Sequence, residues 1–131
     1  MLFSDNDISW RKNGVGSLLE ALEDNPEASF SYGAYMLGDE LRCNQFYNAE
    51  LLKRANFAST MSLIRVKDFP GFDESLKRFQ DWDVWLTLAE QGKYGVHCGE
   101  IIFDTEVRDG ITQSGPDLRE SWEALKTKHN L

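Results

Sequence analysis

The sequence predicts an α/β fold in which a mixed sheet packs against helices. Segments with strand-like patterns alternate with amphipathic, helix-like segments along the whole chain. With 131 residues, the chain is long enough for one domain with a modest core. Hydrophobic residues make up 41% of it and aromatic residues 12%, which is typical of a folded globular protein. We therefore expect a single domain over residues 1–131.

The first half of the chain carries clear start and stop signals. Ser17 and Glu20 match a capping box, in which a hydroxyl and a carboxylate satisfy free backbone N–H groups at the start of a helix. This pattern predicts a helix that begins at Ser17 and is ended by Asn25 and Pro26. The other elements expected in this half are the end of a strand at 2–3, a strand at 29–37, a turn at 38–39, a pairing strand at 40–47 and a short helix capped by Asn48.

The second half alternates in the same way. Asp81 stands where a helix N-cap is expected, and the apolar side of the following segment predicts an amphipathic helix that ends before Gly92. Pro116 suits the first turn of a last helix. The other elements expected in this half are a strand or extended chain at 59–66, a loop at 70–73 and a strand at 94–103.

Charge and cysteine content limit the possible partners. The formal net charge is −8, and no cluster of Lys and Arg occurs, which argues against binding to nucleic acids or anionic membranes. No apolar run approaches membrane-spanning length, and no signal peptide is recognisable at the start. The two cysteines, Cys43 and Cys98, form no CxxC pair. We expect a cytoplasmic protein with reduced thiols.

Two acidic residues near the start form the first candidate site. On extended backbone, Asp5 and Asp7 point to the same side while Asn6 faces away. Like charges held together repel unless a cation lies beside them, and Mg²⁺ or Mn²⁺ suits such carboxylates. A calcium loop is excluded, because Trp10 and Gly16 occupy its required Gly and Glu positions. The alternative is a solvated turn or a helix N-cap.

The segment QDWDVWLTLAEQG holds the second candidate site. A carboxylate at Asp81, fixed at the positive end of a helix, suits a general base that takes a proton from a sugar hydroxyl. Asp83 lies in the first turn, where negative charge is favourable. The alternative is an ordinary capped helix in which Trp82 and Trp85 belong to the core.

These segments together resemble the acceptor-side, C-terminal half of a family 2 glycosyltransferase of the GT-A fold. The resemblance covers roughly residues 1–113, and residues 114–131 form the additional C-terminal helix. The matching motifs, in chain order, are LFSDND, FSYGAYML, STMSLIRV, PGFDESL and QDWDVWLTLAEQG.

The resemblance implies an enzyme that transfers a sugar from a nucleoside-diphosphate sugar to an acceptor hydroxyl. The reaction would be inverting and dependent on Mg²⁺ or Mn²⁺. Asp5 and Asp7 fall on the metal- and diphosphate-binding motif, and Asp81 falls on the catalytic base. The remaining matches are Trp82 and Asp83 on the acceptor side and Arg108 near the phosphates.

The chain also departs from the family. Gln80 and Thr87 replace a common Glu and Arg, and the family's nucleotide-binding half has no counterpart, so we expect this chain to be incomplete for catalysis alone. An alternative is a non-catalytic module, derived from the same fold, that binds carbohydrate or protein through Trp10, Tyr35 or Trp122. We also expect a homodimer, formed through an open sheet edge at the first strand.

Overall fold

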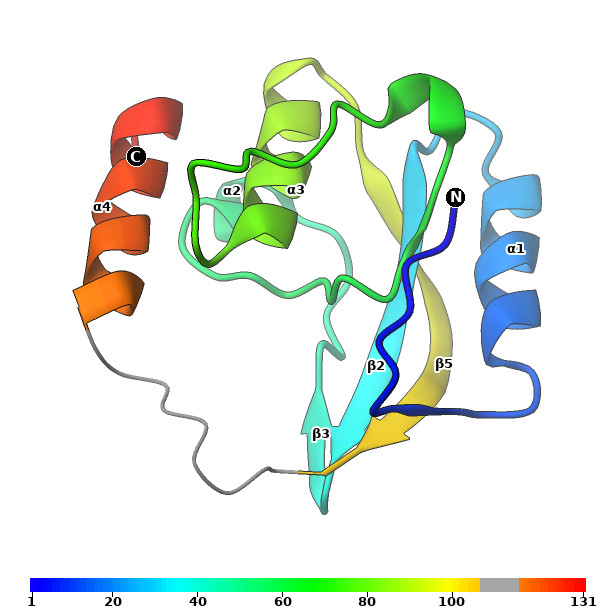
Figure 1. Ribbon diagram of the computed structural model, residues 1–131. Coiled ribbons are helices and arrows are strands. Elements are labelled where there is room, and N and C mark those ends of the chain that lie inside the picture. Colours follow the sequence, from blue (N-terminus) through cyan, green and yellow to red (C-terminus); the bar gives the residue numbers. More distant parts are fainter. Residues whose placement is uncertain (107–115) are drawn as a thin grey trace.

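The computed structural model describes residues 1–106 and 116–131. It shows a mixed sheet with helices on both of its faces (Figure 1). The elements, in chain order, are β1 (Ser9–Trp10), α1 (Gly14–Asp24), β2 (Phe30–Leu37), β3 (Glu40–Arg42), α2 (Ala49–Leu52), β4 (Leu63–Ile64), the 3₁₀ helix η1 (Val66–Asp68), α3 (Gln80–Glu90), β5 (Gly95–Thr105) and α4 (Pro116–His129).

Two long parallel strands, β2 and β5, form the centre of the sheet. The strand order is β1-β5-β2-β3, and β4 pairs with the first residues of β2. Strands β1, β3 and β4 are all antiparallel to their partners. Helix α1 covers one face, α3 covers the other, and α4 lies outside α3 (Figure 1). The predicted mixed α/β architecture is therefore confirmed.

The larger part of the core lies between the sheet and α3. There, Phe30 of β2 stacks on Trp85 of α3, with ring centroids 4.2 Å apart. Gly95 makes room for this pair, since a Cβ at that position would lie 2.3 Å from the ring of Phe30. A smaller cluster under α1 contains Leu18, Met61, Ile102 and Phe103. Both long strands are thus fixed in place by apolar burial on each face.

Several sequence predictions are confirmed. The strands expected at 29–37 and 94–103 correspond to β2 and β5. Gly38 and Gly92 occupy left-handed backbone (φ +59° and +77°) at the turn after β2 and after α3. The Asn48 side chain accepts hydrogen bonds from the N–H groups of Glu50 and Leu51, which makes it the cap of α2.

Other element boundaries were wrong. Helix α1 begins at Gly14 rather than Ser17, so Ser17 and Glu20 lie inside the helix and form no capping box. Within 59–66, expected as strand or extended chain, the strand is β4 alone, and the strand expected at 40–47 shrinks to β3. The expected strand end at 2–3 is a single antiparallel bridge between Leu2 and Leu63.

The edge of the sheet is formed by β1 and not by the first strand expected at 2–3, which makes only its single bridge. Strand β1 has two residues, Ser9 and Trp10, and is antiparallel to β5.

Among the described residues, no helix combines the length and apolar character needed to cross a lipid bilayer. Within the same ranges Cys43 and Cys98 are free thiols, and burial raises the pKa of Cys43 to about 12, so this thiol stays protonated.

Candidate functional site

A cavity of about 380 Å³ lies at the start of α3 and brings together residues that are distant in sequence. Asp5, from the N-terminal segment, and Asp81, from the first turn of α3, both line it. Lys77 and Arg78, just before α3, line it as well. Three phenylalanines form the apolar part of the wall: Phe3, Phe72 and Phe79. Both charge signs and an apolar wall therefore share one cavity.

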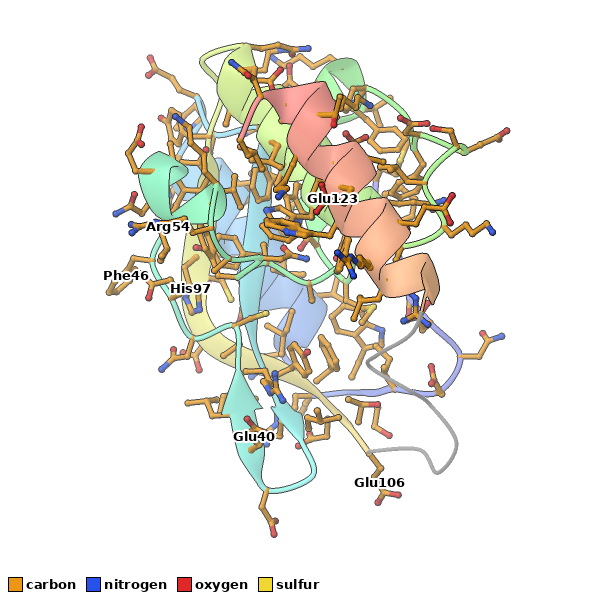
Figure 2. The ribbon with its side chains drawn as sticks, turned by 90° about the vertical axis from the view of Figure 1, so that its left-hand side faces the viewer. Glu40, Phe46, Arg54, His97, Glu106 and Glu123 are labelled. Atoms are coloured by element: carbon orange, nitrogen blue, oxygen red, sulfur yellow. The ribbon has the colours of Figure 1, made fainter. Side chains whose placement is uncertain are left out.

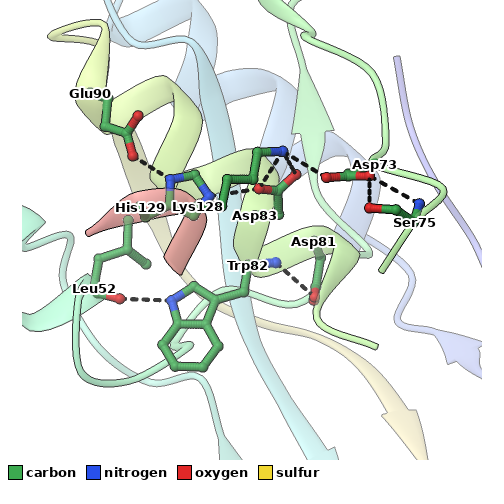
Figure 3. A network of polar contacts seen from close by, with 9 residues as sticks. All are labelled: Leu52, Asp73, Ser75, Asp81, Trp82, Asp83, Glu90, Lys128 and His129. Carbon is green, nitrogen blue, oxygen red and sulfur yellow. Dashed lines mark hydrogen bonds and ion pairs between the residues drawn. The ribbon is translucent and has the colours of Figure 1, made fainter. Parts of the chain in front are cut away.

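The carboxylate of Asp81 is held by several donors. The Thr60 hydroxyl donates to Oδ2 at 3.0 Å, and the Asn56 amide lies 3.4 Å from the same oxygen. The backbone N–H of Trp82 donates to Oδ1 at 2.8 Å (Figure 3). These bonds fix the orientation of the side chain and leave it partly accessible, which is what a proton-accepting group requires.

The predicted N-cap role of Asp81 was wrong. Helix α3 begins at Gln80, and the N-cap is Phe79, which adopts left-handed backbone (φ +63°) and makes no side-chain cap bond. Asp81 lies in the first helical turn, so its carboxylate still lies at the positive end of the helix. Phe79 also lines the cavity, so the left-handed residue before α3 places the start of this helix at the cavity wall.

Asp5 and Asp7 do not line the same cavity. The backbone turns at Asn6 and Asp7, so the extended geometry expected there is absent. Asp7 lines a separate cavity of about 670 Å³ with Asp39 and Asp104, beyond the carboxyl ends of β2 and β5. A turn therefore separates the two carboxylates, and Asp5 alone lines the cavity that contains Asp81.

The described residues offer a limited set of metal ligands. Within residues 1–106 and 116–131, no group of three or more His, Cys, Asp or Glu side chains could hold a metal ion. The Asp81 cavity nevertheless presents one exposed carboxylate, Asp5. A single carboxylate fits Mg²⁺ or Mn²⁺ only when substrate phosphates and water supply the remaining ligands.

Trp82 follows Asp81 directly but is not part of the lining of the Asp81 cavity. Its side chain is buried, its indole N–H donates to the carbonyl of Leu52 at 2.7 Å, and its ring stacks on Trp122 of α4. Trp85 is also buried, so both tryptophans belong to the core. A contact of Trp82 with an acceptor stays a prediction.

Asp83 faces away from the Asp81 cavity and joins α3 to α4. Its side chain is 3% exposed, and Lys128 Nζ lies 3.0 Å from Oδ1. His129 Nε2 lies 2.6 Å from the same oxygen (Figure 3). These residues line a third cavity, of about 360 Å³, with Glu90. Both carboxylate oxygens of Asp83 are thus engaged within the fold, and its acceptor-side role stays a prediction.

Lys128 links Asp83 to a loop beside the Asp81 cavity. Its Nζ lies 3.0 Å from Asp73 Oδ2, and Asp73 also accepts bonds from the N–H and hydroxyl of Ser75. The Ser75 hydroxyl and then Lys128 lower the pKa of Asp73 to about 2. Burial opposes the charge on Lys128, but its bonds to Asp73 and Asp83 outweigh burial and raise its pKa.

The structure explains why Gln stands at position 80, where the family commonly has Glu. Its amide donates to the carbonyl of Leu76 at 2.7 Å, which an ionised Glu could not do. Thr87, the other departure, lines the cavity that contains Asp83. Arg108 lies outside the described residues.

The aromatic residues proposed as a sugar-binding surface are packed against other rings. Trp10 meets Phe103 edge-on, and Tyr35 stacks on the same ring at 4.6 Å. Trp122 stacks on Trp82. Among the described aromatic residues, Phe46 is the most exposed, at 78%, and it lies beside His97 (Figure 2).

Sequence reasoning missed several residues of these clusters, among them Thr60, Lys128 and His129. A signal for the last two was present, because Asp83 interrupts an otherwise apolar run from Trp82 to Leu86. A carboxylate in a buried run requires a cationic partner. That partner could not be named from sequence, since α4 lies far away along the chain.

Comparison with known proteins adds no family assignment. No protein-family model matches the chain, and no curated protein sequence matches it either.

Proposed function

We propose that this chain is a glycosyltransferase-like domain that acts on a nucleoside-diphosphate sugar and an acceptor hydroxyl. The observation that carries the proposal is the shared cavity of Asp5 and Asp81, which come from opposite parts of the sequence. The motif resemblance supplies the reaction type. The GT-A assignment and the inverting outcome belong to the same proposal.

Asp81 acts as the base in this scheme. Its carboxylate takes the proton of an acceptor hydroxyl, and the hydroxyl oxygen attacks the anomeric carbon of the donor sugar. The bond from that carbon to the diphosphate oxygen breaks, and the electron pair leaves with the nucleoside diphosphate. Thr60 and the N–H of Trp82 orient the carboxylate for this proton transfer.

Asp5 is the proposed ligand of Mg²⁺ or Mn²⁺, and substrate phosphates would complete the coordination. The bound cation would supply positive charge to the leaving diphosphate. Lys77 and Arg78, on the same cavity, favour the approach of a phosphate-bearing ligand to a chain whose net charge is −8. Asp7, on its separate cavity, is outside this ligand set.

Calorimetry tests the cation site. We expect Mn²⁺ titrated with uridine diphosphate present to release heat with wild-type protein, and the Asp5→Asn variant to lose that heat. The matched control is Asp24→Asn, an exposed position at the end of α1, and this variant should behave as wild type. Asp81→Asn should retain cation binding and lose sugar transfer to an acceptor. Unchanged heats with Asp5→Asn would reject the cation role.

A second candidate function has one observation in its favour. The ring of Phe46 is 78% exposed and lies against His97, with centroids 5.9 Å apart. Exposed aromatic rings of this kind stack on sugars or partner proteins. A non-catalytic binding module would bind glycans without metal, would be unaffected by Asp81→Asn, and would lose binding with Phe46→Ala.

A further inference from the structure

Aromatic rings form the apolar wall of the Asp81 cavity. Phe3 comes from the N-terminal segment, Phe72 comes from the loop before α3, and Phe79 is the N-cap residue of this helix. The rings of Phe3 and Phe72 contact each other, with centroids 5.0 Å apart. Three apolar rings from two distant parts of the chain therefore share one cavity with the carboxylate of Asp81.

The fold holds this wall in place. The ring centroid of Phe69 lies 5.5 Å from that of Phe3 and 5.3 Å from that of Phe72, so Phe69 supports both rings without lining the cavity itself. Phe79 meets the ring of Trp82 edge-on at 5.6 Å. All four phenylalanines pack against the main hydrophobic core. Since the wall is already ordered, a ligand that binds to it loses little free energy in ordering the protein.

The cavity combines this apolar wall with a hydrogen-bonding side. The three rings that line it are half-buried, so an apolar group placed on them removes further apolar surface from water, which is favourable. Asp81 and Thr60, joined by their hydrogen bond, supply polar groups in the same cavity. Ligand sites commonly have this composition, with an apolar lining and a few polar groups that fix orientation. The ligand that fits presents a hydroxyl to Asp81 and an apolar group to the phenylalanines.

Within the proposed reaction, this chemistry suits the acceptor better than the donor. The acceptor hydroxyl lies at Asp81, and Phe79 precedes Asp81 by only two residues, so the group attached to that hydroxyl lies beside the wall. The nucleobase of a donor is separated from its anomeric carbon by a ribose and two phosphates. The cavity volume of about 380 Å³ is near the lower end of the range for ligand sites, about 300 to 1,000 Å³, and suits one ligand of moderate size.

We propose that the acceptor carries an aromatic or other apolar group beside the hydroxyl that it presents to Asp81, and that Phe3, Phe72 and Phe79 select this group. The proposal rests on the proposed function for the role of acceptor, and it names the substrate class of the same site. A nucleobase is also a flat ring that stacks on phenylalanine, so uridine serves as the competitor that separates the two sources.

An NMR titration with two glycosides tests the preference without metal or nucleotide. Phenyl β-glucopyranoside and methyl β-glucopyranoside differ only in the apolar group. We expect the phenyl compound to bind about tenfold more tightly and to shift the signals of Phe3, Thr60 and Phe79. Equal affinities, shifts confined to residues outside the cavity, or no shift with either compound would overturn the proposal. Uridine should not displace the phenyl compound, and displacement would overturn the proposal by assigning the wall to the donor.

Two Phe→Leu variants separate contact with the ligand from packing within the protein. Phe3→Leu removes a ring that lines the cavity, so it should lower the affinity for the phenyl compound about threefold and leave that for the methyl compound unchanged. Phe69→Leu, a matched change in the same cluster but outside the lining, should keep both wild-type affinities. Equal losses in the two variants would show that the rings act only through packing, which would overturn the proposal.

Sugar-transfer assays with the same two compounds separate this proposal from the proposed function. We expect a higher kcat/KM for the phenyl compound, by about the same tenfold factor as its affinity. Binding that prefers the phenyl compound, with no transfer to either, would reject the proposed function and keep the binding preference. Transfer with equal kcat/KM to both compounds would keep the proposed function and overturn the acceptor class.

Discussion

The indole of Trp82 stacks on that of Trp122, with ring centroids 5.1 Å apart and planes inclined by 21°. This contact joins α3, which carries Asp81, to the C-terminal helix. It is the main aromatic link between the two helices in the described part of the chain, and the charged cluster of Asp83 lies on the next residue of α3.

Removal of this stack should destabilise the fold. We expect Trp122→Ala to lower the free energy of unfolding by about 2 kcal/mol, because Trp122 is partly buried and the cost is smaller than for a fully buried ring. Urea denaturation measures this. Glu123→Ala, on the exposed neighbour, is the control and should change the value by less than about 0.5 kcal/mol. Equal effects would show that Trp122 contributes no packing.

Removal of the charge on Asp83 should lower the free energy of unfolding by more than Trp122→Ala does. Asp83→Asn leaves Lys128 and His129 without a buried counter-charge, and breaking a buried pair on one side costs about 3 kcal/mol. Urea denaturation of Asp83→Asn beside Asp39→Asn, an exposed turn position, gives the comparison. A neutral effect of Asp83→Asn would mean that the cluster does not hold α4.

The ion pair between Asp73 and Lys128 should persist until the pH is far below the ordinary carboxyl pKa. The pKa of Asp73 is lowered to about 2 in the folded state, so the stability it contributes is complete above the ordinary carboxyl pKa and is lost as pH falls through about 2. Carboxyl titration followed by NMR should give a midpoint near that value. Ser75→Ala removes the first cause of the shift and should move the midpoint upwards. An ordinary midpoint in wild-type protein would refute the contact.

Self-association is expected through the open edge at β1. That strand ends the sheet, and unpaired backbone groups at an edge favour association with another copy. Light scattering should show mass increasing with concentration. A constant monomeric mass across the micromolar range would contradict this expectation.

Sequence patterns located the central elements of this fold because their signals are local. The alternating aromatic segment predicts β2, and Gly38 and Gly92 predict where β2 and α3 end. The start of α1 could not be found in this way. A Cβ on Gly14 would lie 2.4 Å from the carbonyl oxygen of Ile102, so a contact with β5 places that residue, and the capping box is overridden.

The candidate site was predictable only in part, for a similar reason. Asp5 and Asp81 could be chosen from their motifs, and the fold brings both to one cavity. Asp7 is separated by a turn that the short motif does not encode. The charged partners of Asp83 come from α4, and the pairing depends on how that helix docks.

Paramagnetic broadening by Mn²⁺ tests the shared cavity most directly. With uridine diphosphate present, Mn²⁺ bound at Asp5 should broaden the NMR signals of Thr60 and Asp81, leave those of Asp24 sharp, and lose this pattern in the Asp5→Asn variant. Broadening centred elsewhere, or unchanged by Asp5→Asn, would contradict a common site for the cation and the base.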